Sequence, residues 1–303
     1  MNQVSVVYLS SLLAAACASD RDSTGRERVT ASVDTGRVAV PGSSLFYEAA
    51  GEGAPVILLH GGNLDRRMWD AEFDFLKQQY RVIRYDARGY GRSGRIDTTF
   101  AAHEDLLALM DSLALPRATL IGLSLGGRIA LDFALAHPER VDRLVLAGPG
   151  ISGGKWAEDG DTVWLKAARR AVAEKDSMGL ALAWLESAYI RTALRDSAMA
   201  SRLRQIVIEN SRFWMDLIRL NDPEREAEPP AAGRLGEIRA PVLLLVGEED
   251  TPFIQDVARA IAAQAPNVRR IDLPGVGHMV NLEAPDRFRQ AVLEFLAAPA
   301  AAR

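Results

Sequence analysis

Short runs of apolar residues recur along this chain, and most of them end at a glycine, an aspartate or a serine. Runs of this form suit parallel strands that are buried on both faces of a sheet. Two runs near the amino end, 37–40 and 44–50, indicate strands at a sheet edge. The other strand candidates are residues 55–61, 80–88, 118–124, 141–149, 241–250 and 268–275. The pattern therefore predicts an eight-stranded sheet.

Helical patterns separate these strands, with apolar side chains repeated along one face. The helical segments are residues 65–78, 99–114, 126–137, 254–265 and 284–297. Strand and helix alternating at this rhythm predict βαβ units, and hence an α/β fold with a mostly parallel sheet flanked by helices. We expect this core to cover residues 36–150 and 237–298, with a disordered tail at 299–303.

Residues 151–236 break the rhythm, because they contain helical patterns and no strand candidate. Glycine and proline are frequent at both ends of the segment. We predict a helical cap inserted after the sixth strand. Four of the five tryptophans lie in it: Trp156, Trp164, Trp184 and Trp214. Most of them would form the core of the cap itself, whereas one or two could line a substrate pocket over the strand ends.

Composition adds limits on size and on partners. The chain has 303 residues, 48% hydrophobic and 25% charged, which is enough for one large α/β domain with an insertion. Its net charge of -4 gives no electrostatic reason to expect nucleic acid as a partner. Beyond the first twenty residues no run of about 20 apolar residues predicts a membrane span.

The first 17 residues form an apolar stretch followed by small residues, which resembles a secretory signal. The run "LLAAAC" is similar to the lipobox of bacterial lipoproteins, although Ala14 stands where Leu is more usual. Cys17, the only cysteine, has no intramolecular disulfide partner and would be the lipidated residue. An ordinary cleaved signal and a cytoplasmic protein with an apolar start are the alternatives. We expect export, to the periplasm or to a lipid anchor on a bacterial membrane, with residues 18–35 as a flexible tether.

The motif G-x-S-x-G at residues 122–126 raises the question of chemistry. It occurs by chance in ~10% of chains of this length, so the motif alone does not show whether its serine is catalytic. The position of the motif in the fold has to answer that question. Ser124 lies where a buried strand ends and a helix begins, with Gly122 and Gly126 on either side. A turn this sharp needs small neighbours, and it lifts the hydroxyl above the sheet beside a helix N-terminus. We predict that Ser124 is a nucleophile rather than part of an ordinary glycine-rich turn.

A serine nucleophile needs a histidine base that is oriented by an acid. His278 follows a strand, in a loop with two glycines, and it is the last of the four histidines. It therefore fits the chain order of serine, acid and histidine. His103 lies in a polar helical stretch and His137 at a helix end, so neither suggests a base. We expect His60 to hold its loop rather than to move protons.

The acid is expected at a strand end between the serine and the histidine. Asp250 follows the run "LLLVGEE" and fits best. Glu249 is its nearest rival and Glu248 a weaker one. Asp272 lies inside its strand and fits less well.

The developing oxyanion needs backbone N–H donors. One is the N–H of Leu125, which directly follows the nucleophile. The second is expected in the loop after "VILLHG", with Gly62 as first choice and Asn63 as second. This chemistry implies no metal and no organic cofactor.

Taken together, the motifs "HGG", "YDARGYGRSG", "GLSLGG", "VGEEDTPF" and "GVGHMVNLEAP" resemble those of the α/β-hydrolase superfamily, in the branch with a helical cap. The resemblance covers residues 36–298. It implies that Ser124 is the nucleophile, Asp250 the acid and His278 the base, with Gly62 and Leu125 as oxyanion donors. A serine nucleophile argues against haloalkane dehalogenases and epoxide hydrolases, which use aspartate.

Within the superfamily the chain is most similar to small carboxylesterases, 3-oxoadipate enol-lactonases and meta-cleavage C–C hydrolases. Those catabolic enzymes are usually cytoplasmic, so the signal-like start favours a general esterase that forms an acyl-enzyme on Ser124. The partner would be a small ester or lactone. A C–C hydrolase or enol-lactonase, a cofactor-free perhydrolase and a non-enzymatic small-molecule receptor are the alternatives.

A different class of function is suggested by Gly89–Gly94, which matches G-x-G-x-x-G after a strand and could be a dinucleotide-binding loop. In the dinucleotide fold this turn runs straight into a helix, whereas here residues 95–102 intervene. We therefore interpret these glycines as shaping a loop near the mouth of the site.

Overall fold

A computed structural model describes residues 32–157, 162–221 and 223–298 of this protein, and the described residues from Val33 onwards belong to one compact unit. The signal-like residues 1–17, including Cys17, lie outside the described residues, as does the predicted tail at 299–303. Export and lipidation therefore stay predictions. Among the described residues no helix is both long and apolar enough to cross a bilayer.

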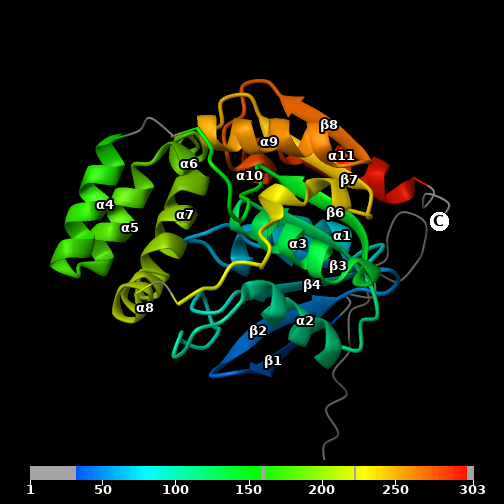
Figure 1. Ribbon diagram of the computed structural model, residues 1–303, viewed down its shortest axis with the longest axis horizontal. Coiled ribbons are helices and arrows are strands. Elements are labelled where there is room, and N and C mark those ends of the chain that lie inside the picture. The colour runs from blue at the N-terminus through cyan, green and yellow to red at the C-terminus, as the bar shows by residue number, and fades with distance from the viewer. Residues whose placement is uncertain (1–31, 158–161, 222, 299–303) are drawn as a thin grey trace, which may run out of the picture. The chain divides into compact units, whose positions relative to one another are not determined.

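The sheet has eight strands in the order β1-β2-β4-β3-β5-β6-β7-β8 (Figure 1). β1 pairs antiparallel with β2, and β2 with β4, whereas the remaining pairs are parallel. The strands are β1 Asp34–Val40, β2 Ser43–Ala50, β3 Pro55–Leu59, β4 Arg81–Asp86, β5 Ala118–Leu123, β6 Val141–Ala147, β7 Val242–Gly247 and β8 Val268–Leu273. The predicted mostly parallel eight-stranded sheet is thus confirmed.

The predicted flexible tether, residues 18–35, ends too late, because its last two residues belong to a strand. Asp34 and Thr35 already belong to β1, where they pair with Ala49 and Glu48 of β2. The side chains of this stretch are polar, so the apolar pattern does not mark it. The strand extends this far because its backbone groups find hydrogen-bonding partners in β2.

Helices lie between the strands, close to the predicted segments. They are α1 Asp70–Leu76, α2 Ala102–Ser112, α3 Leu125–Ala136, α9 Pro252–Gln264, α10 Val280–Glu283 and α11 Pro285–Ala297. The segment predicted at 65–78 is divided, because a short 3-10 turn over Arg66–Trp69 precedes α1. α2 begins later than the predicted residue 99, since Phe100 forms a β-bridge with Glu224 instead.

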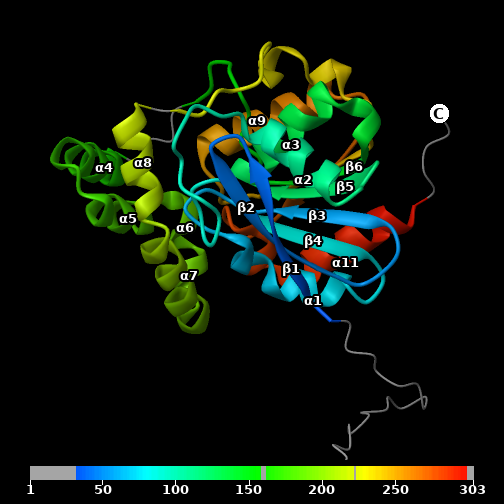
Figure 2. The same ribbon diagram turned by 90° about the horizontal axis from the view of Figure 1, so that it is seen from below.

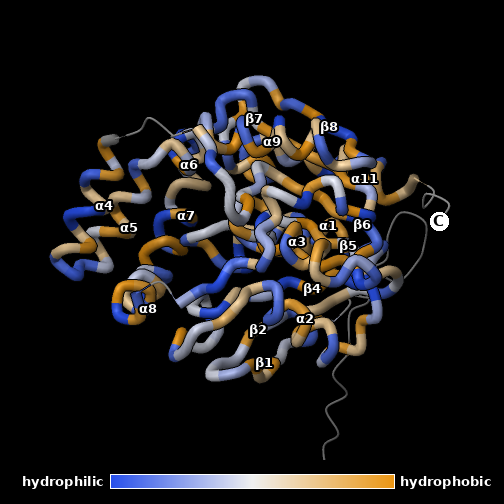
Figure 3. Tube along the Cα trace, viewed as in Figure 1, coloured by the Kyte–Doolittle hydropathy of each residue, from blue (hydrophilic) through white to orange (hydrophobic). Residues whose placement is uncertain are grey.

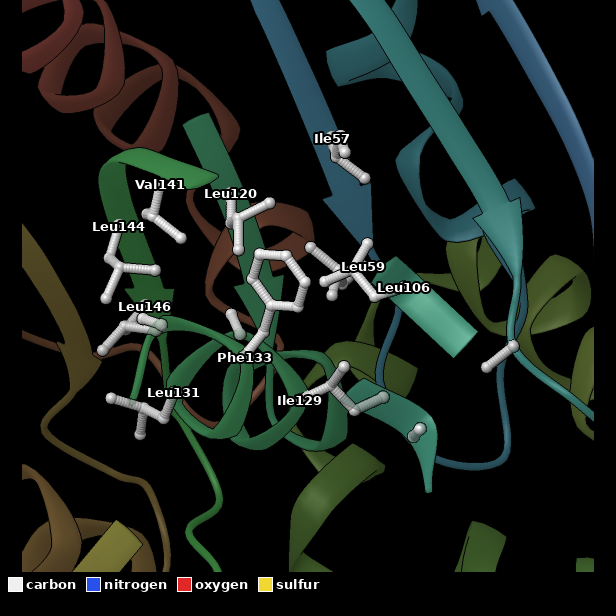
Figure 4. Close-up of a cluster of buried hydrophobic side chains, with 14 of the residues drawn as sticks. Ile57, Leu59, Leu106, Leu120, Ile129, Leu131, Phe133, Val141, Leu144 and Leu146 are labelled. Atoms are coloured by element: carbon white, nitrogen blue, oxygen red, sulfur yellow. The ribbon is translucent and has the colours of Figure 1, made fainter. Parts of the chain in front are cut away.

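The sheet separates two hydrophobic cores, and alternate residues of each strand enter opposite cores. Ile57 and Leu59 of β3 belong to the core on the side of α2 and α3, whereas Val56 and Leu58 belong to the core on the side of α1 and α11. Figure 2 shows these two pairs of helices on opposite faces of the sheet. Figure 4 shows Phe133 pointing from α3 towards the strands in the first of these cores. In Figure 3 the segments around the central strands and α3 are largely apolar. This double burial explains why the central strands are continuous apolar runs.

Helices also fill the chain between β6 and β7. They are α4 Thr162–Glu174, α5 Ser177–Leu185, α6 Ala188–Arg191, α7 Ser197–Glu209 and α8 Arg212–Leu220. They gather on one side of the sheet in Figures 1 and 2, which confirms a helical cap after the sixth strand. We call α4 to α8 the cap, and its expected limits of 151 and 236 stay a prediction. The continuous pattern at 197–220 is interrupted at Asn210, which ends α7.

Candidate active site

Ser124 lies at a sharp turn between β5 and α3, with φ 54° and ψ −111°. A positive φ is unusual for a residue with a side chain and costs conformational energy. Backbone hydrogen bonds hold it there: its N–H donates to Ala147 O at 3.1 Å, and its carbonyl accepts from Gly150 N at 2.9 Å and Arg128 N at 3.0 Å. The hydroxyl is thereby presented at the carboxyl end of the sheet.

The glycines beside Ser124 are required by close packing. A β-carbon on Gly122 would overlap the backbone of Gly126, and one on Gly126 would overlap the carbonyl oxygen of Leu59 in β3. No other residue type fits either position without moving the backbone. The expectation that this serine needs small neighbours is therefore confirmed.

Asp250 and His278 meet after the ends of β7 and β8. The His278 Nδ1 lies 2.9 Å and 3.0 Å from the two carboxylate oxygens of Asp250, and both side chains are buried. The carboxylate also accepts the Thr251 N–H at 2.7 Å. With Nδ1 donating to the carboxylate, Nε2 is the imidazole nitrogen left to exchange a proton with a substrate.

The rival acids point elsewhere. The Glu249 carboxylate lies 3.6 Å from Arg195, and its side chain is about half exposed. Glu248 is exposed, and Asp272 pairs with Arg270 at 2.7 Å. Of the carboxylates considered in the sequence, the structure brings Asp250 to His278.

The two expected oxyanion donors are neighbours across the site. A β-carbon on Gly62 would lie 3.9 Å from the β-carbon of Leu125. Leu125 is the first residue of α3, where backbone N–H groups have no acceptor within the helix. Gly62 lines the same pocket as Ser124, whereas Asn63 is not among its lining residues. This geometry favours Gly62 over Asn63.

His60 is held at both ring nitrogens. Its Nδ1 donates to Gly61 O at 2.8 Å, and its Nε2 accepts the Ala87 N–H at 2.9 Å. Burial lowers the pKa of His60, which favours this neutral form. These contacts agree with a structural role. His103 and His137 both lie beside Glu104, at 3.4 Å and 3.6 Å, and neither lines the pocket around Ser124.

A pocket of about 160 Å³ joins these elements. Its lining residues are Gly61, Gly62, Leu123, Ser124, Trp184, Tyr189, Phe253, Ile254, His278 and Met279. Trp184 and Tyr189 come from the cap, so the expectation that a cap tryptophan faces the pocket is confirmed. No Lys, Arg, Asp or Glu is among these residues. A hollow of about 600 Å³ at the amino ends of β3, β5 and β6 contains none of the expected site residues.

Three contacts of the Asp250–His278 pair were missed by the sequence analysis. The Tyr189 ring stands edge-on to the imidazole, with centroids 4.9 Å apart. A β-carbon on Gly148, whose φ is +46°, would lie 2.9 Å from the Asp250 carboxylate. Glu283 hydrogen-bonds the backbone on both sides of His278. The motif "GVGHMVNLEAP" contains Glu283. An acidic residue in this mostly apolar stretch is the feature of the sequence that could have indicated a contact with the His278 loop.

The loop Gly89–Gly94 is packed against other parts of the protein, which leave no space for a ligand at Gly91. A β-carbon on Gly91 would overlap the Asp86 carboxylate, and the Gly91 N–H donates to Asn210 Oδ1 at 2.6 Å. Tyr90 stacks on Phe213 of α8, with ring centroids 4.0 Å apart. These contacts do not fit a dinucleotide site. None of the loop's residues lines the pocket, and its expected place near the mouth of the site stays a prediction.

Comparison with known proteins identifies relatives of similar sequence and fold. A family model described as the alpha/beta hydrolase fold matches residues 54–285. A 2-hydroxy-6-oxononadienedioate/2-hydroxy-6-oxononatrienedioate hydrolase from Burkholderia vietnamiensis is 30% identical over 263 residues, which cover 83% of this chain and 90% of that protein.

Two solved structures are also similar. The enol-lactonase from Burkholderia xenovorans LB400 has a TM-score of 0.71 and 25% identity, covering 87% of this chain and 100% of that one. The carboxylesterase CesB from Bacillus subtilis has a TM-score of 0.68 and 26% identity, covering 88% of this chain and 92% of that one.

Proposed function

This chain belongs to the α/β-hydrolase family and is a hydrolase, and on that premise we propose that it cleaves small, uncharged carboxylic esters or lactones through an acyl-enzyme on Ser124. The observation that carries the proposal is the pocket. It holds Ser124 and His278 together, His278 bears a buried carboxylate partner, and the other side chains around them are apolar or aromatic. Family membership with hydrolase relatives also favours an enzyme over a receptor.

The proposed reaction has two steps. The Ser124 Oγ attacks the ester carbonyl while His278 Nε2 takes its proton, and the N–H groups of Leu125 and Gly62 stabilise the oxyanion. The imidazolium then protonates the departing alcohol, which leaves the acyl group on Ser124. In the second step His278 deprotonates a water molecule, which attacks the acyl carbon. The acid is released and Ser124 recovers its proton.

The lining of the pocket supports the limits on the substrate. Placing a carboxylate among Trp184, Phe253 and Ile254 would remove its hydration, and no lining side chain supplies a compensating cation. The volume of about 160 Å³ suits an acyl group of a few carbons. Both properties favour a neutral, short-chain ester or a small lactone.

C–C bond hydrolysis is the second candidate, because relatives about 30% identical are named as hydrolases of dienedioates. A substrate of that kind carries two carboxylates. The uncharged pocket therefore favours ester cleavage, although the same serine, histidine and aspartate would be available to either reaction.

The experiment measures hydrolysis of p-nitrophenyl esters from acetate to octanoate by the wild type and Ser124→Ala. We expect activity highest with short chains and lowered by several orders of magnitude in the variant. Ser201→Ala, a change on the exposed face of α7, is the matched control and should keep wild-type rates. Equal turnover by Ser124→Ala would refute the proposal. Turnover of a dienedioate but of no ester would establish the second candidate instead.

A further inference from the structure

Glu283 accepts hydrogen bonds, through its carboxylate, from the peptide backbone on both sides of His278. It is the last residue of α10, and its Oε2 accepts the Gly277 N–H at 2.7 Å while its Oε1 accepts the Met279 N–H at 3.0 Å. One carboxylate thus holds the amides that precede and follow the histidine. Hydrogen bonds to a charged acceptor are stronger than neutral ones, so these two bonds restrain the backbone at His278.

The loop that carries His278 is also packed tightly at Gly277. A β-carbon there would lie 2.9 Å from the Thr192 β-carbon at the end of α6, and a β-carbon on Gly247 would overlap the Gly277 carbonyl. Neighbouring atoms therefore limit where this loop can lie. The carboxylate of Glu283 also fixes the orientation of the loop, because its two hydrogen bonds orient the peptide groups on either side of His278.

The charge of Glu283 lies close to the catalytic pair. Burial raises the pKa of this carboxyl, whereas the two amides and His278 lower it and Asp250 raises it. Around the imidazole, the titratable groups are thus Asp250 at Nδ1, the edge of Tyr189, and Glu283 behind the backbone. A negative charge at this place stabilises an imidazolium more than a neutral imidazole.

We propose that Glu283 is a positioning residue for His278, which fixes the loop through its two amides and stabilises the imidazolium that forms during catalysis. The inference rests on the proposed function, in which His278 is the base. It gives the protein two carboxylates with different tasks. Asp250 orients the ring, and Glu283 orients the backbone that bears the ring.

The test compares Glu283→Gln, Glu283→Asp and Asp286→Asn on the best p-nitrophenyl ester. Gln has nearly the same size but no charge, and its NH2 group would face one of the amide donors. Asp keeps the charge but is too short to reach both amides. Asp286, at the start of α11 and fully exposed, is the matched control for loss of a carboxylate.

We expect Glu283→Gln to lower kcat about tenfold to 100-fold with KM within about twofold, because a misplaced base slows proton transfer but does not weaken substrate binding. The acid limb of the pH profile of kcat/KM should move to lower pH by ~0.5 unit, since the imidazolium loses a neighbouring negative charge. Glu283→Asp should lower kcat without moving the limb, and Asp286→Asn should change neither.

An unchanged kcat and pH limb in Glu283→Gln would overturn the inference, and so would an equal shift in Asp286→Asn. If neither Glu283 variant folds, amide hydrogen exchange of the wild type tests the inference instead. Slow exchange at the Gly277 and Met279 amides supports their hydrogen bonds to Glu283, and fast exchange at both contradicts them. Retained turnover in Ser124→Ala would instead reject the proposed function itself, so the two failures are distinguishable.

Discussion

The carboxylate of Asp65 and the side-chain amide of Asn210 lie 2.9 Å apart, although 145 residues separate them in the chain. Both side chains are buried. The same amide donates to Ile206 O at 2.8 Å and accepts from Gly91 N at 2.6 Å. Asp65 ends the loop that contains Gly62, so Asn210 joins the cap to this loop and to the loop after β4.

Asn210→Ala should destabilise the protein, because it leaves the part-buried Gly91 N–H without its acceptor and removes one of the donors to the buried Asp65 carboxylate, which keeps Arg67. The expected loss is about 1–3 kcal/mol in the free energy of unfolding, measured with urea. Gln205→Ala is the matched control on α7, since Gln205 bonds an exposed Glu209, and it should cost under about 0.5 kcal/mol. Equal losses in the two variants would contradict a specific link through Asn210.

Asp250→Asn should lower kcat about 10⁴-fold, as expected when the acid of a serine–histidine–acid set can no longer hold the correct tautomer. Glu249 is not placed to substitute for it, because its carboxylate faces Arg195. Glu249→Gln therefore serves as the control and should keep kcat within about twofold. Comparable losses in both variants would mean that Glu249 takes part, and ester hydrolysis rates decide between the outcomes.

Trp184→Leu should enlarge the pocket and move the preferred acyl chain towards longer esters. Removing the indole opens space in the pocket that Ser124 lines, so kcat/KM for octanoate relative to butyrate should rise about tenfold. Trp156→Leu is the control, because Trp156 bonds Gly153 O and does not line the pocket. A chain-length profile that is the same in both variants would show that Trp184 does not bound the acyl site.

His60 should make stability fall as the pH falls. Burial lowers the pKa of His60 in the folded protein below its usual value of 6.5, so the unfolded chain binds this proton more tightly. The contribution is complete above about pH 6.5 and is lost as the pH decreases, by at most about 1.4 kcal/mol per pH unit. Urea unfolding between about pH 5.5 and 7.5 measures the slope. His60→Gln, which can donate and accept at similar places, should flatten it; an unchanged slope would assign the effect to other groups.

Much of the fold follows from local pattern. The runs at 55–61, 118–124 and 241–250 are apolar because those strands are buried on both faces, and the structure contains them as β3, β5 and β7. Ser124 was also recognisable, since the glycines that make its turn possible are its neighbours in the chain. Features of this kind depend on residues a few positions apart, which a sequence shows directly.

Other choices depended on side-chain direction. Glu248, Glu249 and Asp250 are consecutive, and their order does not reveal which carboxylate turns towards a histidine 28 residues later. Gly62 and Asn63 are likewise adjacent, and only the packed structure shows that Gly62 lines the pocket and Asn63 does not. The break at Asn210 was hidden as well, because the helical pattern continues through it.

The sequence alone therefore determined the eight strands, the position of the cap and the candidate nucleophile, since each is encoded by periodicity or by immediate neighbours. The tertiary structure decided which acid meets His278 and which cap tryptophan lines the pocket with Ser124. It also decided that Glu283 holds the loop of His278 and that Asn210 holds the loop that ends at Asp65. These contacts join segments that are distant in the chain or aim one side chain among several. Their geometry is set by how the packed elements meet, which no local pattern contains.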